Sequence, residues 1–109
     1  MKDEYIVYGR VVDRKTHQGI PGLRVEAWDK DLILDDFLGS DSTDSAGGFR
    51  IGIRASDFRE LSLDTAPDLY FRVYQRRHMI RSTEDSVLWN ADAENRGIII
   101  EVQGNLGRD

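Results

Sequence analysis

Apolar and polar residues alternate at every second position along much of this chain of 109 residues. A period of two is typical of β-strands that bury one face in a core. The cleanest example is the segment 49–54, where Phe49, Ile51 and Ile53 fall on one face. The same pattern predicts further strands over residues 5–13, 23–28, 69–74, 79–83 and 97–103.

Turn-forming residues separate these segments at intervals of about ten residues. Two clusters, 16–22 and 44–48, are rich in glycine and in polar residues that favour turns. The segment 56–60 predicts one short helical turn with Ser56 as its N-cap. No longer helical period is present. The pattern therefore predicts one all-β domain over residues 1–109, a sandwich or small barrel of six or seven short strands.

The alternation stops between Asp29 and Asp44, and we predict a loop over this segment. The loop is acidic, since it holds six aspartates and a single base, Lys30. We expect its end to re-enter the core at residues 37–39. Overall the chain carries a net charge of −5, so a nucleic-acid partner is not expected.

The rest of the composition narrows the class of protein. Hydrophobic residues make up 39% of the chain, enough for a core, and cysteine is absent. No apolar run is long enough to cross a bilayer, and residues 1–5 lack the apolar region of a signal peptide. We expect a cytoplasmic protein or a part of an exported assembly.

Three stretches of the sequence share a pattern of glycines and turns. They are VYGRVVD over residues 7–13, THQGIPGLRVEA over 16–27 and TDSAGGF over 43–49. This pattern resembles the transthyretin-like, carboxypeptidase-regulatory-like superfamily, and residues 67–73 are similar to a strand of its bacterial members. The resemblance implies a seven-stranded Greek-key sandwich of the prealbumin type. It also implies an accessory, carrier or adhesive module within a larger protein.

Two of the motif residues have a physical reading of their own. Gly9 predicts a close approach over the sheet. Asp44 predicts a turn in which its carboxylate accepts hydrogen bonds from its own loop, while Gly47 or Gly48 takes a left-handed conformation. Both are devices that build a fold, so they indicate architecture and not activity.

The residues do not assemble a catalytic set. One enzymatic branch of the superfamily, 5-hydroxyisourate hydrolase, implies several histidines, an arginine and a C-terminal Tyr-Arg-Gly-Ser. This chain has two histidines, His17 and His78, and ends in NLGRD. It also lacks cysteine, a Gly-x-Ser-x-Gly elbow and a cluster of zinc ligands. We therefore expect a protein that is not an enzyme and needs no cofactor.

The acidic loop is a candidate calcium site. It looks like the calcium loop of C2 domains, and carboxylates are ligands that Ca²⁺ prefers. The interval from Asp31 to Asp36 is one residue short of the usual spacing, and no second acidic loop clearly follows. The alternative is that these acids are solvated, cap turns or pair with arginines. The candidate ligands are Asp29, Asp31, Asp35 and Asp36.

Three other features are candidate contacts for a partner. The aliphatic run Leu32, Ile33 and Leu34 either packs over the sandwich edge, which we favour, or forms an exposed contact tip. Trp89 is a candidate because tryptophan is enriched at contact centres. A basic hairpin either meets an acidic surface or is simply solvated. Its arginines are Arg72, Arg76, Arg77 and Arg81.

These observations predict a non-catalytic interaction or structural module, a component of a larger bacterial protein or assembly. The alternative is a calcium-dependent binding module that uses the loop Asp29–Asp44. The expected partner is a protein or the rest of a longer chain. Ile99 falls on the outer face of the last predicted strand, so pairing between copies into a homo-oligomer is a further option.

Overall fold

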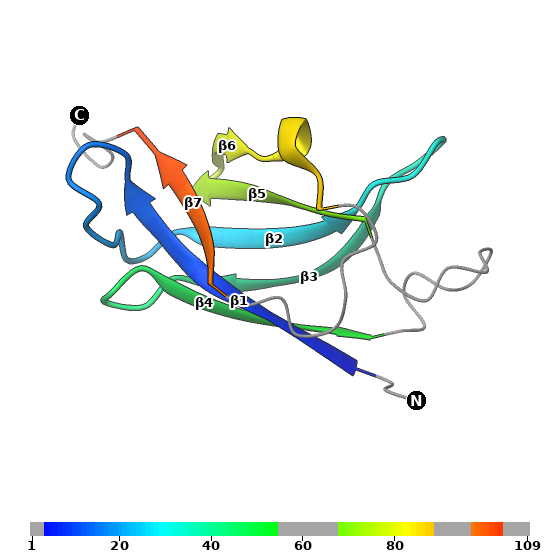
Figure 1. Cartoon of the computed structure of the whole chain (residues 1–109), viewed down its shortest axis with the longest axis horizontal. Helices are drawn as coiled ribbons and strands as arrows, with labels where there is room; N and C mark the ends of the chain where they lie inside the picture. The colour runs from blue at the N-terminus through cyan, green and yellow to red at the C-terminus, as the bar shows by residue number, and fades with distance from the viewer. Residues whose placement is uncertain (1–3, 55–67, 89–96, 104–109) are drawn as a thin grey trace.

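The computed structural model describes residues 4–54, 68–88 and 97–103, which fold into two β-sheets facing one another (Figure 1). The three-stranded sheet has the order β4–β1–β7, with β1 at Glu4–Asp13, β4 at Gly48–Arg54 and β7 at Ile98–Val102. The four-stranded sheet has the order β3–β2–β5–β6, with β2 at Arg24–Asp29, β3 at Asp36–Ser42, β5 at Leu69–Gln75 and β6 at His78–Ser82. The predicted all-β class is confirmed.

Helix is scarce in the part of the chain that the structure describes. It amounts there to one 3-10 turn, η2 (Glu84–Ser86), in a stretch where the sequence shows no strand pattern. Among the described residues no helix is long and apolar enough to cross a membrane. The helical turn predicted at Ser56 and the candidate contact Trp89 lie outside the described residues.

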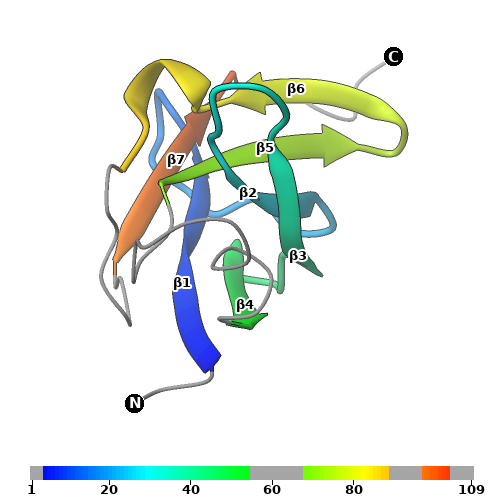
Figure 2. The ribbon, with the colours of Figure 1, turned by 90° about the vertical axis from the view of Figure 1, so that its right-hand side faces the viewer.

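Strands that neighbour one another in a sheet are mostly distant in sequence. β1 pairs with β4 in antiparallel fashion and with β7 in parallel fashion, while β2 pairs with both β3 and β5. The chain therefore crosses between the two sheets several times, and the two groups of strands lie on opposite sides of the core (Figure 2).

The core between the sheets consists of the apolar positions that alternate along the strands. Phe49 and Phe71 bring the two sheets together, with ring centroids 5.8 Å apart. Burial of each such side chain contributes about 1.5–3 kcal/mol. The predicted core faces of 49–54 and 69–74 are confirmed. The core includes Val7, Val11, Val25, Ala27, Phe49, Ile51, Ile53, Leu69, Phe71, Val73, Ile100 and Val102.

The two motif residues act as predicted. A Cβ on Gly9 would lie 1.9 Å from the carbonyl oxygen of Ile98, so only glycine lets β7 approach β1 this closely. Asp44 accepts hydrogen bonds from the main-chain N–H of Ala46 and Gly48 at 2.9 and 2.8 Å. Gly47 within that turn has a φ of 81°.

The prediction of one long loop between Asp29 and Asp44 is wrong. Residues Asp36–Ser42 form β3, which pairs with β2 along its whole length. Leu38 is the one residue of β3 in the core, and Gly39 and Asp41 lie opposite the buried Ala27 and Val25, so the alternation of apolar residues is weak in the sequence. Main-chain pairing with β2 holds the strand instead. Leu38 enters the core as expected, whereas Phe37 beside it is 47% exposed.

Candidate contact surface at the β2–β3 hairpin

β2 and β3 form an antiparallel hairpin that projects beyond the sandwich (Figure 1). Its connection, residues 30–35, carries Leu32, Ile33 and Leu34, which are 101, 95 and 75% exposed. We call these three residues the apolar tip. The favoured prediction that they pack over the sandwich edge is wrong, because the hairpin holds them beyond the sheets. Three adjacent aliphatic side chains exposed to water form a candidate contact surface.

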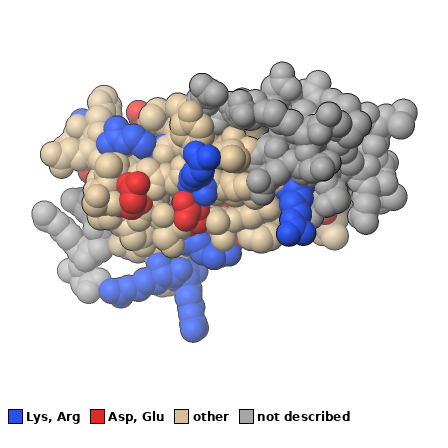
Figure 3. Space-filling model, turned by 90° about the horizontal axis from the view of Figure 1, so that it is seen from below, with Lys and Arg blue, Asp and Glu red and all other residues tan. Residues whose placement is uncertain are grey.

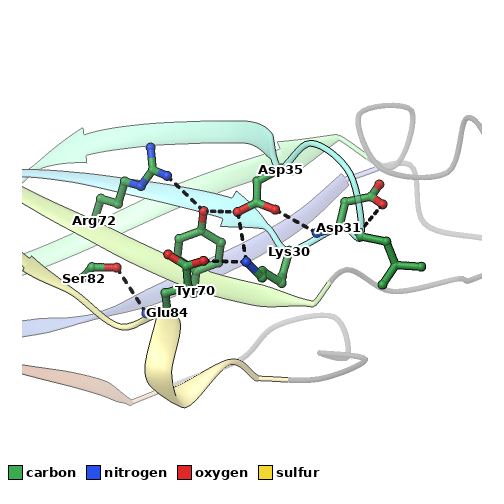
Figure 4. Close-up of polar contacts among 8 residues, drawn as sticks. Lys30, Asp31, Asp35, Tyr70, Arg72, Ser82 and Glu84 are labelled. Atoms are coloured by element: carbon green, nitrogen blue, oxygen red, sulfur yellow. Dashed lines mark hydrogen bonds and ion pairs between the residues drawn. The ribbon is translucent and has the colours of Figure 1, made fainter.

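Asp35 anchors the connection to the body of the domain (Figure 4). Its Oδ2 accepts a hydrogen bond of 2.5 Å from the hydroxyl of Tyr70, which belongs to β5. Its Oδ1 accepts one of 3.0 Å from the main-chain N–H of Asp31. A single carboxylate thus ties both sides of the loop to the four-stranded sheet, and the apolar tip is presented on a fixed support.

Lys30 ties the same loop to η2. Its Nζ lies 3.7 Å from Oδ2 of Asp35 and donates to Oε2 of Glu84 at 2.5 Å. Glu84 is itself positioned by Ser82, whose Oγ accepts from the Glu84 N–H at 3.2 Å (Figure 4). The hairpin base is therefore linked to β5 and to the segment after β6.

The protonation states of this network suit its hydrogen bonds. Burial, and then the hydrogen bond to Asp35, raise the pKa of the Tyr70 hydroxyl, so Tyr70 stays a donor. Burial pushes the pKa of Asp35 upward, but hydrogen bonds from Tyr70 and Asp31 and the charges of Lys30 and Arg72 outweigh it. The pKa of Asp35 is therefore lowered, and Asp35 stays an acceptor.

Arg72 belongs to this network and not to a free basic surface. Its guanidinium carbon lies 4.1 Å from the ring centroid of Trp28, and its Nη2 donates to the Tyr70 hydroxyl at 3.2 Å. Phe37 packs edge-on against Trp28 with centroids 5.6 Å apart. Arg72 thus lies on an aromatic group that backs the hairpin.

The four candidate calcium ligands do not converge. Asp29 accepts from the main-chain N–H of Asp68 at 2.9 Å, and Asp31 accepts from that of Leu32 at 2.6 Å. Asp35 is engaged with Tyr70, and Asp36 begins β3 as an exposed residue. Within residues 4–54, 68–88 and 97–103, no three acidic, histidine or cysteine side chains are placed to hold a metal ion.

Asp29 is electrostatically unusual. Burial is the largest cause that raises its pKa, to about 6. The nearby charges of Asp68, Asp36 and Asp31 raise it further, and the hydrogen bond from the Asp68 N–H opposes them. Asp29 therefore exchanges a proton with solvent within the range of mildly acidic pH.

The predicted basic hairpin forms, but its arginines are divided. Arg76 and Arg77 make the exposed turn between β5 and β6. Arg81 is half-buried and donates to the carbonyl of Ser82 at 3.1 Å. Because β5 runs antiparallel to β2, this turn lies at the opposite end of the four-stranded sheet from the apolar tip.

The sequence did not indicate two features of the structure. Tyr70, fully buried, is the centre of the network, although alternation places it on the outer face of its strand. Arg10, Arg50 and Arg54 project together from the outer face of the β4–β1–β7 sheet, which we call the arginine face. The polar residues that alternate with Phe49, Ile51 and Ile53 could have indicated that Arg50 and Arg54 share an outer face. Only the pairing of β4 with β1 shows that Arg10 belongs to the same face.

The fold has a counterpart among solved structures, although a scan of protein-family models and a search of curated proteins find no match. The crystal structure of a 9R-lipoxygenase from Cyanothece PCC8801 is similar, with a TM-score of 0.65 and 20% sequence identity. The similarity covers 92% of this chain and 17% of the lipoxygenase chain. This chain therefore corresponds to about a sixth of that protein, and the likeness concerns the fold alone.

Proposed function

We propose that this domain is a non-catalytic interaction module, a component of a larger protein or assembly, which makes contact through the apolar tip. The observation that carries the proposal is the near-complete exposure of Leu32, Ile33 and Leu34 on an anchored hairpin. An anchored contact residue loses little conformational entropy on binding, so its burial contributes more fully to affinity.

We also propose that the sandwich is of the Greek-key, transthyretin-like type. The repeated crossings between the two sheets support this, as do Gly9 and the Asp44 turn in the positions that the family pattern gives them. A module of this type fits a role as one part of a longer chain. The lipoxygenase offers an example of a similar fold within a longer polypeptide.

Affinity capture from the cells that express the protein tests the interaction. The variant Leu32→Ser/Ile33→Ser/Leu34→Ser removes the apolar tip, whereas Met79→Ser changes an aliphatic residue on β6 that is 53% exposed. We expect the wild type and Met79→Ser to retain the same specific protein partner and the triple variant to lose it. Equal capture by all three, or capture of nothing by the wild type, would contradict the proposal.

A further inference from the structure

The arginine face groups three arginines on the outer surface of one sheet in an acidic chain, and the exposed Glu101 of β7 lies on the same surface. Among the described residues, Arg10, Arg50 and Arg54 form no ion pair with a carboxylate. Arg10 donates from Nε to the carbonyl of Ala46 at 3.1 Å, and Arg50 lies 5.9 Å from the ring centroid of Tyr8. Seen from below Figure 1, the described surface shows more basic than acidic side chains (Figure 3).

The same face also offers apolar area. Tyr8 pairs with Arg50 across the strands, and the half-buried Ile6 lies two residues before it on β1. Ile99 on β7 is in register with Arg10 and is 55% exposed. Arginine beside a half-buried aromatic side chain and an exposed aliphatic one is a composition typical of a protein contact.

The β2–β3 hairpin combines apolar area with negative charge and is therefore complementary to the arginine face. Its apolar tip lies between two exposed acids, Asp31 on one side and Asp36 on the other. The hairpin points away from β1 and β4 in Figure 1, so a molecule cannot place its tip on its own arginine face. The two surfaces can meet only between two molecules.

We propose that the apolar tip of one molecule binds the arginine face of a second copy of this chain. The aliphatic side chains would pack on Ile99 and Tyr8, with Asp31 and Asp36 directed to the arginines. This proposal rests on the proposed function, because it uses the same apolar tip, and it names the partner. Two different surfaces meet, so the contact is heterologous and builds open chains or rings.

The charges favour a protein occupant over a lipid surface. The anionic headgroups of many membranes repel the acids beside the tip. The arginine face attracts these acids. A hairpin tip on a sheet face makes a small interface, so the association is weak and sensitive to salt.

Sedimentation velocity over a concentration series, at low and high salt, tests the proposal. We expect the mean mass of the wild type to rise with concentration and to fall with added salt. The triple serine variant of the tip should weaken association at least about tenfold, since aliphatic burial is lost. Arg50→Glu/Arg54→Glu should weaken it similarly, while the matched charge change Arg76→Glu/Arg77→Glu at the β5–β6 turn should not.

Charge exchange makes the test specific. Asp31→Lys/Asp36→Lys should fail to associate alone but should associate when mixed with Arg50→Glu/Arg54→Glu. A monomeric wild type at every concentration overturns the proposal, as does equal weakening by the two arginine pairs. Failure of the mixture, when both variants melt as the wild type does, overturns it too.

Two outcomes separate this proposal from the proposed function. A monomeric wild type that still captures another protein through its tip overturns self-association and leaves the interaction module intact. A monomeric wild type that floats with phosphatidylcholine vesicles, when the triple variant does not, overturns both this proposal and a protein partner.

Discussion

At the scale of single residues, the presentation of the apolar tip depends on a buried hydroxyl and one carboxylate. Tyr70 donates to Asp35 and accepts from Arg72, and Asp35 in turn holds the main chain of Asp31. Each hydrogen bond to a charged group contributes about 1.5–3 kcal/mol. Sequence alternation gives the outward position of Tyr70 but not its burial, because burial depends on segments distant in sequence, such as η2, that the fold brings beside β5.

Removal of the hydroxyl should loosen the hairpin. We expect Tyr70→Phe to lower the free energy of unfolding by about 1–3 kcal/mol, because Asp35 loses the hydrogen bond from the Tyr70 hydroxyl. The pKa of Asp35 should also rise toward its ordinary value. Urea denaturation measures the first effect and carboxyl NMR titration the second. Tyr74→Phe, a half-buried tyrosine of the same strand, is the control, and equal effects of the two variants would contradict the network.

Asp29 should give the stability a distinctive pH dependence. Its folded pKa of about 6 lies above its ordinary value, so the folded state binds the proton more tightly than the unfolded state. The contribution of Asp29 to the free energy of unfolding is therefore fully present below about pH 4 and is lost as the pH rises through 6. Asp35 has the opposite effect, because its pKa is lowered: its contribution to the free energy of unfolding is lost as the pH falls through its folded pKa.

The variant Asp29→Asn isolates this effect. Its stability should lack the decline between pH 4 and 6, and at pH 8 it should exceed that of the wild type by about 1 kcal/mol, a value discounted for solvent screening of a partly exposed group. Unfolding by urea across this pH range measures the difference. Parallel stability curves for the two proteins would show that Asp29 titrates normally.

At the scale of elements, the sandwich depends on close approach between strands and on tight turns. Alternation predicted β1, β4 and β5 closely, because apolar side chains on one face of each strand enter the core. It also predicted β6, although no residue of β6 is fully buried. It missed β3, which places only Leu38 in the core and is held by main-chain pairing with β2. It also missed the exposure of the apolar tip. That exposure depends on how far β2 and β3 extend beyond the neighbouring strands, which the alternation pattern does not give.

Gly9 offers a test of strand approach. A Cβ at this position would collide with the main chain of Ile98, so Gly9→Ala should displace β7 and cost about 1–3 kcal/mol or more. Hydrogen exchange should show the loss of protection in β7 first. Gly22→Asn is the matched control, because Gly22 has a φ of 75° with open space around it and asparagine tolerates this conformation. Unchanged protection of β7 in Gly9→Ala would contradict the packing.

At the scale of the whole molecule, charge and apolar area are distributed unevenly. The four-stranded sheet ends in an acidic, apolar hairpin at one end and in Arg76 and Arg77 at the other. The arginine face lies on β1 and β4 of the second sheet. The sequence indicated the two charged segments of opposite sign. It could not indicate that Arg72 is used internally or that Arg10, Arg50 and Arg54 share one face. Both facts depend on strand pairing between distant segments.

Site-specific photocrosslinking in the cells that express the protein tests the central claim, that the apolar tip is its contact surface. A photoreactive side chain is placed at Ile33 in one variant and at Met79, also exposed, in another. We predict that position 33 forms one dominant protein adduct and that position 79 does not, because only the tip is buried on binding. Adducts in equal yield from both positions, or none from position 33, would contradict the account.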